Sequence, residues 1–331
     1  MDSNKIYTEV VRVHPDELVM FSRIEYIKDT RHFNKKSLSN LKLNYSRTKL
    51  SENSERKAKR AIKYMLFGTN EKKAWNPKYN STYTFKVNFI TLTLPSIQKH
   101  SDIEIKKGLL NQFLIECKIK YKLTNYVWKM EKQRNGNVHF HILGDQFIPY
   151  SELNNIWNRL CLKMGYSKEY KVSNKTKIAN STDIHSLRKI KNVVGYVLKY
   201  MVKEDKKNRL KIHRSNIEFK PSPDYNKNSL SINTKRFLNN TAQRGRIWTC
   251  SYNLTKLKGG EEELDNMLKS EIELLKKKKG TRVYNKDFCT ALYMDSNILS
   301  PELTPNLYRI LMDYIRKLFP NYQTQIILNS N

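Results

Sequence analysis

Two histidines stand one residue apart in the stretch NGNVHFHILGD, residues 135–145. In a β-strand, side chains at positions i and i+2 point to the same face, so His139 and His141 would lie side by side while Phe140 points the other way. Neighbouring imidazoles can bind a metal ion together, or they can donate hydrogen bonds to water or a phosphate. The spacing alone favours neither interpretation, and a third metal ligand would separate them.

The candidate third ligand is Glu131, which precedes the histidines on the expected partner strand of a hairpin. A two-residue Asn-Gly turn would pair Glu131 with Phe140 and place the carboxylate on the wrong face. A three-residue loop that ends at Gly136, in a left-handed conformation, would instead pair Glu131 with His139. The metal hypothesis therefore requires the longer loop.

The longer loop would also place Lys129 opposite His141, where its ammonium group could contact DNA. Two imidazoles and one carboxylate leave coordination positions for water and phosphate oxygens. Such a mixed nitrogen and oxygen site suits Mg²⁺ or Mn²⁺, and the imidazoles favour Mn²⁺. The sequence therefore predicts a divalent-metal site formed by His139, His141 and Glu131.

Two tyrosines, Tyr196 and Tyr200, lie four residues apart in NVVGYVLKYMVK, so they share one face of an expected helix. The apolar stripe of that helix lies roughly 100 to 140° away, which makes them poor candidates for core tyrosines. Lys203 lies on the tyrosine side and Lys199 is adjacent to it. A phenol, with a free pKa of about 10, is a possible nucleophile. The competing interpretation is a pair of amphipathic tyrosines at the margin of a helix that packs on a sheet.

The chain of 331 residues carries a formal net charge of +31, from 62 Lys and Arg against 31 Asp and Glu. Its hydrophobic share of 39% is enough to fill a core. A protein with this excess of positive charge is most simply a binder of polyanions, and nucleic acid is the commonest polyanion. AT-rich coding would enrich Lys and Asn, but it would not explain the shortage of acidic residues.

Several classes of protein are not indicated. The four cysteines are scattered without a CxxC pair, which argues against a zinc knuckle and a disulfide framework. There is no G-x-x-x-x-G-K-[ST] loop, so an ATP-driven motor is not expected. The first residues, MDSNKIYTEV, lack an apolar signal segment, and no apolar run approaches membrane-spanning length. We therefore expect a soluble cytoplasmic protein with no membrane partner.

Residues 1–80 are polar and basic, and they include an expected helix at 51–68. It would open on Ser51 or Ser54 and stop at Gly68. One face of this helix is basic, which fits either plain solvated surface or a DNA contact. The candidate contacts on this face are Lys57, Lys59, Arg60 and Lys63.

The middle of the chain alternates between strand and helix signals. FKVNFITLTLP is expected to form a central strand that ends at Pro95, and a helix should follow at 102–117. After the histidine hairpin, SELNNIWNRLCLKMG has the spacing of an amphipathic helix stopped by Gly165. A short strand, YKVSN, should precede a helix that begins near Thr182 or Asp183, contains His185 at its start and continues through both tyrosines.

The last third of the chain begins with a segment, about 205–245, that is rich in Lys, Asn and Ser and is expected to be a linker. Two helices are expected beyond it. EEELDNMLKSEIELLKKKK has acidic residues first and lysines last, which suits the helix dipole, and PNLYRILMDYIRKLF is amphipathic.

Three segments in this order, FITLTLP, HFH and YVLKYMVK, resemble the three motifs of the HUH endonucleases that initiate rolling-circle replication. The doubled tyrosine with a lysine after each is most similar to the replication initiators of microviruses, which are small single-stranded DNA phages, and of related plasmids. The resemblance covers about residues 82–205. It implies an α+β fold with a central five-stranded antiparallel sheet, flanking helices and the histidine hairpin at its centre. We therefore expect three regions: a basic, partly helical extension at 1–80, the endonuclease domain at 81–205, and a linker with a mainly helical region at 206–331.

The resemblance also implies an activity, which is the nicking and rejoining of single-stranded origin DNA through a 5′-phosphotyrosine intermediate that leaves a 3′-OH primer. Its expected partners are origin DNA and the helicase and DNA polymerase of a bacterial host cell. Two alternatives stay open: a transposase or mobilisation relaxase of the same class, and a non-enzymatic protein that binds single strands by stacking aromatic residues on bases. The implied roles are metal ligands for His139, His141 and Glu131, nucleophiles for Tyr196 and Tyr200, and supporting lysines for Lys199 and Lys203.

Overall fold

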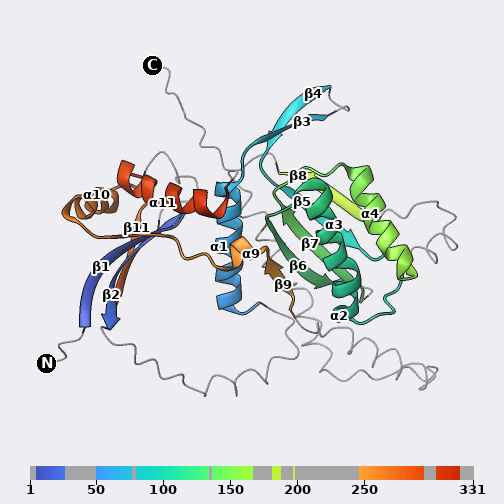
Figure 1. Ribbon diagram of the computed structural model, residues 1–331, viewed down its shortest axis with the longest axis horizontal. Coiled ribbons are helices and arrows are strands. Elements are labelled where there is room, and N and C mark those ends of the chain that lie inside the picture. The colour runs from blue at the N-terminus through green and yellow to red at the C-terminus, as the bar shows by residue number, and fades with distance from the viewer. Residues whose placement is uncertain are drawn as a thin grey trace, which may run out of the picture. The chain divides into compact units, whose positions relative to one another are not determined.

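The computed structural model describes residues 5–26, 50–76, 80–133, 136–166, 181–187, 197, 246–293 and 303–320. The chain divides into two compact units. The histidine unit comprises Leu41–Ile62 and Lys73–Ser251, and the terminal unit comprises Met1–Asn40, Lys63–Lys72 and Tyr252–Asn331. Within the described residues, each unit contains one five-stranded antiparallel sheet (Figure 1).

The sheet of the histidine unit has the strand order β8-β5-β7-β6-β9, with β7 at its centre. β6 and β7 form the expected hairpin, and β5 is an interior strand, in agreement with its nearly continuous apolar sequence. The predicted five-stranded antiparallel sheet with the histidine hairpin at its centre is therefore confirmed. Its strands are β5 (Asn88–Thr93), β6 (Tyr126–Lys132), β7 (Val138–Gly144), β8 (Thr182–Ser186) and β9 (Trp248–Cys250).

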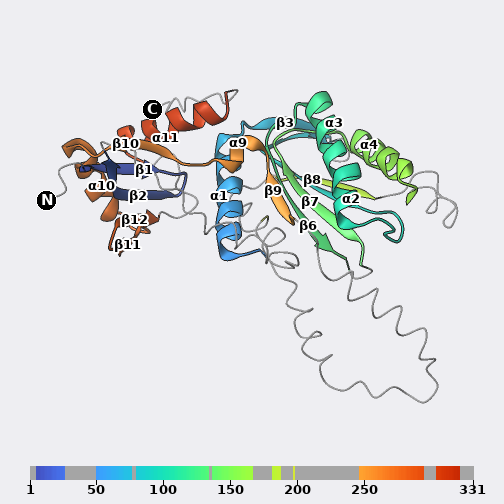
Figure 2. The same cartoon turned by 60° about the horizontal axis from the view of Figure 1, so that its bottom comes forward.

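Helices cover one face of this sheet, as both ribbon views show (Figures 1 and 2). The first helical segment runs without a break through α2 (Asp102–Ile105), a π-helical turn η3 (Lys106–Leu110) and α3 (Asn111–Tyr121). The second is α4 (Tyr150–Lys163). Both were expected from the sequence, although the first is four residues longer than predicted.

Local sequence explains where these helices begin and end. The Ser101 side chain accepts a hydrogen bond from the Glu104 N–H, and the Glu104 carboxylate accepts one from the Ser101 N–H, which forms a capping box. Lys122 ends α3 in a left-handed conformation, with φ of 58°. Gly165 adopts φ of 86° just after α4, as its predicted role as a stop signal requires.

Aromatic side chains form the core between the sheet and its helices. The ring of Phe140, on β7, lies 6.3 Å from the ring of Trp157, on α4, and Trp157 lies 6.0 Å from Phe113, on α3. Trp157 is fully buried, as the sequence predicted. Because side chains alternate along a strand, the burial of Phe140 on this face leaves His139 and His141 on the opposite face.

The sheet of the terminal unit combines strands from both ends of the chain, in the order β10-β1-β2-β12-β11. Its helices are α10 (Asn266–Lys276) and α11 (Pro305–Leu318), and α11 packs against β1 and β10. A Cβ atom on Gly260 would lie 2.4 Å from the Ile310 carbonyl oxygen, so glycine is required for this close packing. The strands are β1 (Lys5–Val13), β2 (Glu17–Tyr26), β10 (Gly260–Glu263), β11 (Arg282–Lys286) and β12 (Cys289–Tyr293).

Four further elements complete the described chain. Helix α1 (Glu52–Gly68) has residues in both units, and its predicted start is confirmed because the Ser51 hydroxyl accepts a hydrogen bond from the Ser54 N–H at 3.2 Å. β3 (Lys72–Asn76) and β4 (Ser81–Phe85) form a two-stranded sheet. The short helix α9 (Tyr252–Thr255) follows β9.

Three expectations about the elements were wrong. The N-terminal segment forms two strands as well as a helix, and the C-terminal segment contributes three strands where mainly helices were expected. The charged helix expected at 261–279 begins only at Asn266, because Gly260–Glu263 pairs with β1. The helix expected from Thr182 is the strand β8, which pairs with β5, so a helix-start role for His185 does not hold. The predicted strand YKVSN lies outside the described residues.

The region boundaries at 80 and 205 stay a prediction. The two compact units follow a different division, since β1 and β2 share a sheet with strands that come some 250 residues later.

Candidate active site

The hairpin has the register that the metal hypothesis requires. Glu131 lies directly opposite His139, and Lys129 lies opposite His141. At the turn, the Gln133 N–H donates to the Asn137 carbonyl at 2.8 Å, and Gly136 adopts φ of 84°. The loop is therefore the longer one, and its glycine supplies the left-handed conformation that was predicted for it.

Two threonines on β5 continue the histidine rows across the sheet. Thr93 pairs with His139 and Thr91 pairs with His141. The Thr93 hydroxyl lies 3.0 Å from Nδ1 of His139, and the Thr91 hydroxyl lies 3.4 Å from Nδ1 of His141. Contacts at Nδ1 fix the orientation of an imidazole and favour Nε2 as the nitrogen that can bind a ligand.

The Glu131 carboxylate lies between a lysine and a histidine. Its Oε1 is 2.5 Å from Nζ of Lys129, and its Oε2 is 3.5 Å from Nε2 of His141. Burial raises the pKa of Glu131, but the contact with His141 and the positive charge of Lys129 outweigh this effect and lower the pKa to about 2. Glu131 is therefore an anion throughout the physiological pH range.

His139 has the opposite character. Burial and the neighbouring His141 lower the pKa of His139 to about 4, although the charge of Glu131 acts against this shift. The two imidazole rings lie close together, with centroids 4.5 Å apart in an edge-to-face arrangement. His139 is consequently neutral near pH 7, which is the form that binds a metal ion.

The donor set suits a divalent cation, while the observed geometry is not a formed metal site. Among the described residues, no three His, Cys, Asp or Glu side chains are arranged as a metal cluster. The Glu131 carboxylate is directed to Lys129 and would have to shift toward the imidazoles to complete one. The chemistry fits because an ionised carboxylate and a neutral imidazole already stand on one face, opposite each other in the hairpin.

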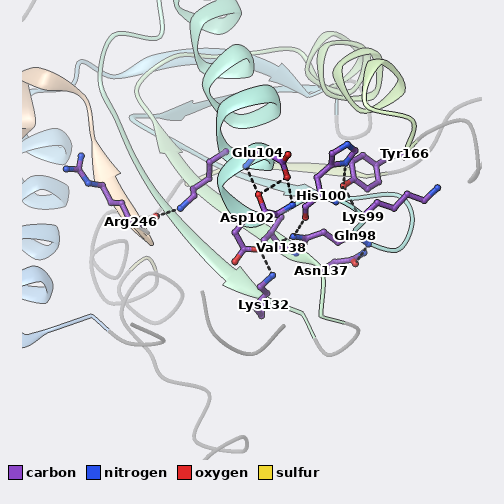
Figure 3. Close-up of polar contacts among 12 residues, drawn as sticks. Gln98, Lys99, His100, Asp102, Glu104, Lys132, Asn137, Val138, Tyr166 and Arg246 are labelled. Atoms are coloured by element: carbon purple, nitrogen blue, oxygen red, sulfur yellow. Dashed lines mark hydrogen bonds and ion pairs between the residues drawn. The ribbon is translucent and has the colours of Figure 1, made fainter. Parts of the chain in front are cut away.

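Side-chain hydrogen bonds fasten the segment between β5 and α2 to the hairpin (Figure 3). The Gln98 side chain accepts from the Val138 N–H at 2.8 Å and donates to Asp102 at 2.9 Å. Asp102 also pairs with Lys132, on β6, at 2.5 Å, and both side chains are largely buried. These contacts hold the first residues of β7, and with them His139, against a fixed neighbour.

The far end of the same segment is fixed by Tyr166, which follows α4 (Figure 3). Its hydroxyl lies 2.8 Å from Nδ1 of His100 and accepts hydrogen bonds from the N–H groups of Lys99 and His100, at 3.2 and 3.1 Å. These contacts explain the presence of His100 structurally, without a role in chemistry.

The expected nucleophiles are not placed by the structure. Tyr196, Tyr200, Lys199 and Lys203 lie outside the described residues, as does most of the helix predicted for them. Val197 is described and is buried. The roles of the two tyrosines and two lysines stay predictions.

The proposed DNA contacts on α1 differ in their surroundings. Lys57 is exposed, and Lys59 pairs with Glu55 at 2.6 Å on the helix surface. Lys63 forms an ion pair with Asp16, and burial lowers its pKa. That pairing argues against a DNA contact for Lys63, whereas the surface positions of the helix stay compatible with one.

Lys129, the remaining proposed contact, is buried within the site, with 8% of its surface exposed. Its ammonium group is held by Glu131. Lys129 is thus placed to act on an anion at the histidines, and it is not placed for general attraction of the DNA backbone.

Sequence reasoning missed Thr91, Thr93 and Asp183 as members of this face. Asp183, on β8, pairs with Thr91 and continues the row that contains His141. A signal was present, because FITLTLP repeats threonine with the same period of two as the histidines. Asp183 could not be found this way, since its segment was interpreted as a helix.

Residues 87–205 match a family model described as Replication-associated protein, of the ORF2 type. The matched segment begins just before β5 and includes the histidine hairpin, β8 and both tyrosines. The resemblance to replication proteins that the three motifs indicated is thereby confirmed. No curated protein and no solved structure matches the chain significantly.

None of the helices in the part of the chain that the structure describes is long and apolar enough to span a membrane.

Proposed function

We propose that this protein is a rolling-circle replication initiator that nicks single-stranded origin DNA and later rejoins it. The observation that carries the proposal is the pairing of Glu131 with His139 on the central hairpin, within the segment that matches the replication-associated family. A protein that only bound single strands would need basic and aromatic residues, but it would not need an ionised carboxylate opposite a neutral imidazole.

His139, His141 and Glu131 are the residues that would hold a divalent cation, Mg²⁺ or Mn²⁺. When bound, such a cation offsets the charge of a phosphate oxygen and so makes the phosphorus easier to attack. The hydroxyls of Thr91 and Thr93 keep the two imidazoles oriented toward the same point, and Lys129 adds a positive charge beside them.

The covalent step assigned to the tyrosines balances without an external energy source. The phenol oxygen of Tyr196 or Tyr200 attacks the phosphorus and loses its proton, and the bond to the 3′ oxygen of the preceding nucleotide breaks. The products are a 5′-phosphotyrosine bond and a free 3′-OH. Attack by a 3′-OH on the phosphotyrosine reverses the step and rejoins a strand without ATP. Lys199 and Lys203 would stabilise the developing negative charge.

The free 3′-OH explains how such a nick would start replication. It would serve as a primer for a host DNA polymerase, while a host helicase would open the duplex ahead of it. Both partners follow from the product, since a nicked strand that is neither extended nor displaced would simply be resealed.

A label at either end of the DNA tests the proposal. The full-length protein is incubated with Mn²⁺ and a pool of random-sequence single-stranded oligonucleotides, labelled either at the 3′ end or at the 5′ end. The proposal predicts a protein-linked band on a denaturing gel with the 3′ label only, because the 5′ fragment leaves with its free 3′-OH. An adduct that carries the 5′ label, or no adduct despite tight DNA binding, would refute it.

A further inference from the structure

A polar pocket of about 370 Å³ opens beside the histidines. This volume lies at the lower end of the range for small-ligand sites, about 300 to 1,000 Å³, so it suits one nucleotide and not several. Every lining side chain has a polar group, which argues against an apolar ligand. The lining residues are Thr91, Thr93, Tyr150, Ser181, Thr182 and Asp183.

The wall of the pocket is fixed by a seam between α4 and the start of β8. The Ser181 hydroxyl donates to Oδ1 of Asn158 at 2.7 Å, and the Thr182 hydroxyl donates to Oδ1 of Asn154 at 3.1 Å. One helical turn before Asn154 stands Tyr150, and one residue after Thr182 stands Asp183. The seam therefore brings the phenol ring and the carboxylate to the same end of the pocket.

The pocket joins directly to the histidine face. Thr91 and Thr93 line it, and their hydroxyls also contact the Nδ1 atoms of His141 and His139. A strand with one phosphate at the histidines would thus place an adjoining nucleotide in the pocket. Tyr150 is 47% exposed there, so its ring is accessible for stacking on a base.

On the basis of the proposed function, the geometry points to a base-recognition pocket for one nucleotide next to the scissile phosphate. Tyr150 stacks on the base, and Asp183 accepts a hydrogen bond from its exocyclic amino group. A carboxylate is an acceptor only, so it matches cytosine, adenine or guanine. Thymine is disfavoured, because carbonyl oxygens flank its single N–H donor and repel the carboxylate. Asp183 is thus a specificity-determining residue.

The test compares oligo(dC) with oligo(dT), which are both unstructured pyrimidine strands. Binding is measured by fluorescence anisotropy with Mg²⁺ in the full-length protein that carries Tyr196→Phe and Tyr200→Phe, so that no strand is cut. The expected preference for oligo(dC) is about tenfold, which corresponds to roughly 1.4 kcal/mol. Asp183→Asn should reduce the ratio to about one, because an amide can present either a donor or an acceptor to the base.

Two controls separate recognition from general electrostatics. Glu116→Gln, on α3, makes the same change in charge outside the pocket and should leave the ratio unchanged. Tyr150→Leu should weaken binding of both strands by about tenfold, while Tyr150→Phe should not, because stacking needs only the ring. Tyr150 is exposed, so neither change should disturb the fold.

Equal binding of the two strands by the starting protein would overturn the inference. So would an Asp183→Asn variant that binds both strands more tightly by one common factor, because the carboxylate would then act only by repelling phosphates. Adduct formation by the wild-type protein is scored separately. If adducts form and the base preference is absent, the pocket inference alone fails, whereas the absence of adducts refutes the proposed function.

Discussion

Glu131 lies directly across from His139 in the central hairpin, and its carboxylate is shared between Lys129 and His141. This relationship depends on a three-residue loop, since a loop shorter by one residue would turn Glu131 to the helix-covered face with Phe140. The placement of one glycine, Gly136, thus decides whether a carboxylate and two imidazoles share a surface.

The first prediction concerns Glu131. Glu131→Gln keeps the size of the side chain but removes its charge, so nicking should fall by about 100-fold or more, because a metal ligand is lost. Binding of single-stranded DNA should change little, since lysines elsewhere supply most of the attraction. Adduct yield and DNA affinity are measured on the same preparation, with Glu116→Gln as the charge-matched control. Undiminished nicking by Glu131→Gln, or by the wild type in EDTA, would contradict the metal role.

The second prediction concerns the threonine that orients His139. Thr93→Val preserves the shape of the side chain but removes the hydroxyl 3.0 Å from Nδ1. Affinity for Mn²⁺, measured by titration calorimetry, should fall by about 10- to 100-fold, as for other contacts that orient metal-binding histidines. Thr91→Val should have a smaller effect, because its contact with His141 is longer, at 3.4 Å. Equal affinities for wild type and Thr93→Val would show that the hydroxyl has no orienting role.

The third prediction separates the lysines of α1. Replacing Lys57, Lys59 and Arg60 by Gln should reduce the slope of log affinity against log salt by up to about 2, since each phosphate contact to a single strand contributes about 0.7. Lys63→Gln should leave that slope unchanged and should lower thermal stability, because Lys63 pairs with Asp16. An unchanged slope in the triple variant would identify this face as plain surface.

The fourth prediction concerns the cysteines. Burial raises the pKa of Cys117 to about 12 and that of Cys250 to about 11, and it also raises the pKa of Cys161. A thiol reagent at pH 8 should therefore label Cys289 alone in the native protein, and Cys289→Ser should abolish rapid labelling. Fast labelling of a second thiol without denaturant would contradict the described packing.

The same shifts set the sign of a pH effect on stability. Thiols whose folded pKa is raised hold their protons in the folded state, while unfolded thiols lose theirs above about pH 8.5. Their contribution to stability is complete below that pH and declines as the pH rises toward 12.

The sequence was sufficient for the hairpin because its determinants are local. A glycine at the end of the loop and a period of two in VHFHILG together specify the register and the faces. The ends of α1, α2 and α4 were also predictable, since a serine or a glycine marks each of them.

The rest depended on contacts between distant parts of the chain. Val10 pairs with Glu263, and no local pattern could indicate a partner so far along the sequence. Thr182–Ser186 was mistaken for the start of a helix because a five-residue segment has too few residues to show a period, and its pairing with β5 decided its structure. Asp183 was missed as a site residue for the same reason.

The central claim is that Tyr196 and Tyr200 are nucleophiles that depend on the histidine site, and peptide mapping of the DNA adduct tests it most directly. Wild-type protein, each single Tyr→Phe variant, the double variant and His139→Ala are incubated with Mn²⁺ and 3′-labelled single-stranded DNA, digested and analysed by mass spectrometry. We predict adducts on peptides that contain Tyr196 or Tyr200, a reduced yield from each single variant, and none from the double variant or from His139→Ala. An adduct that persists in the double variant, or one that forms equally well without His139, would contradict the account.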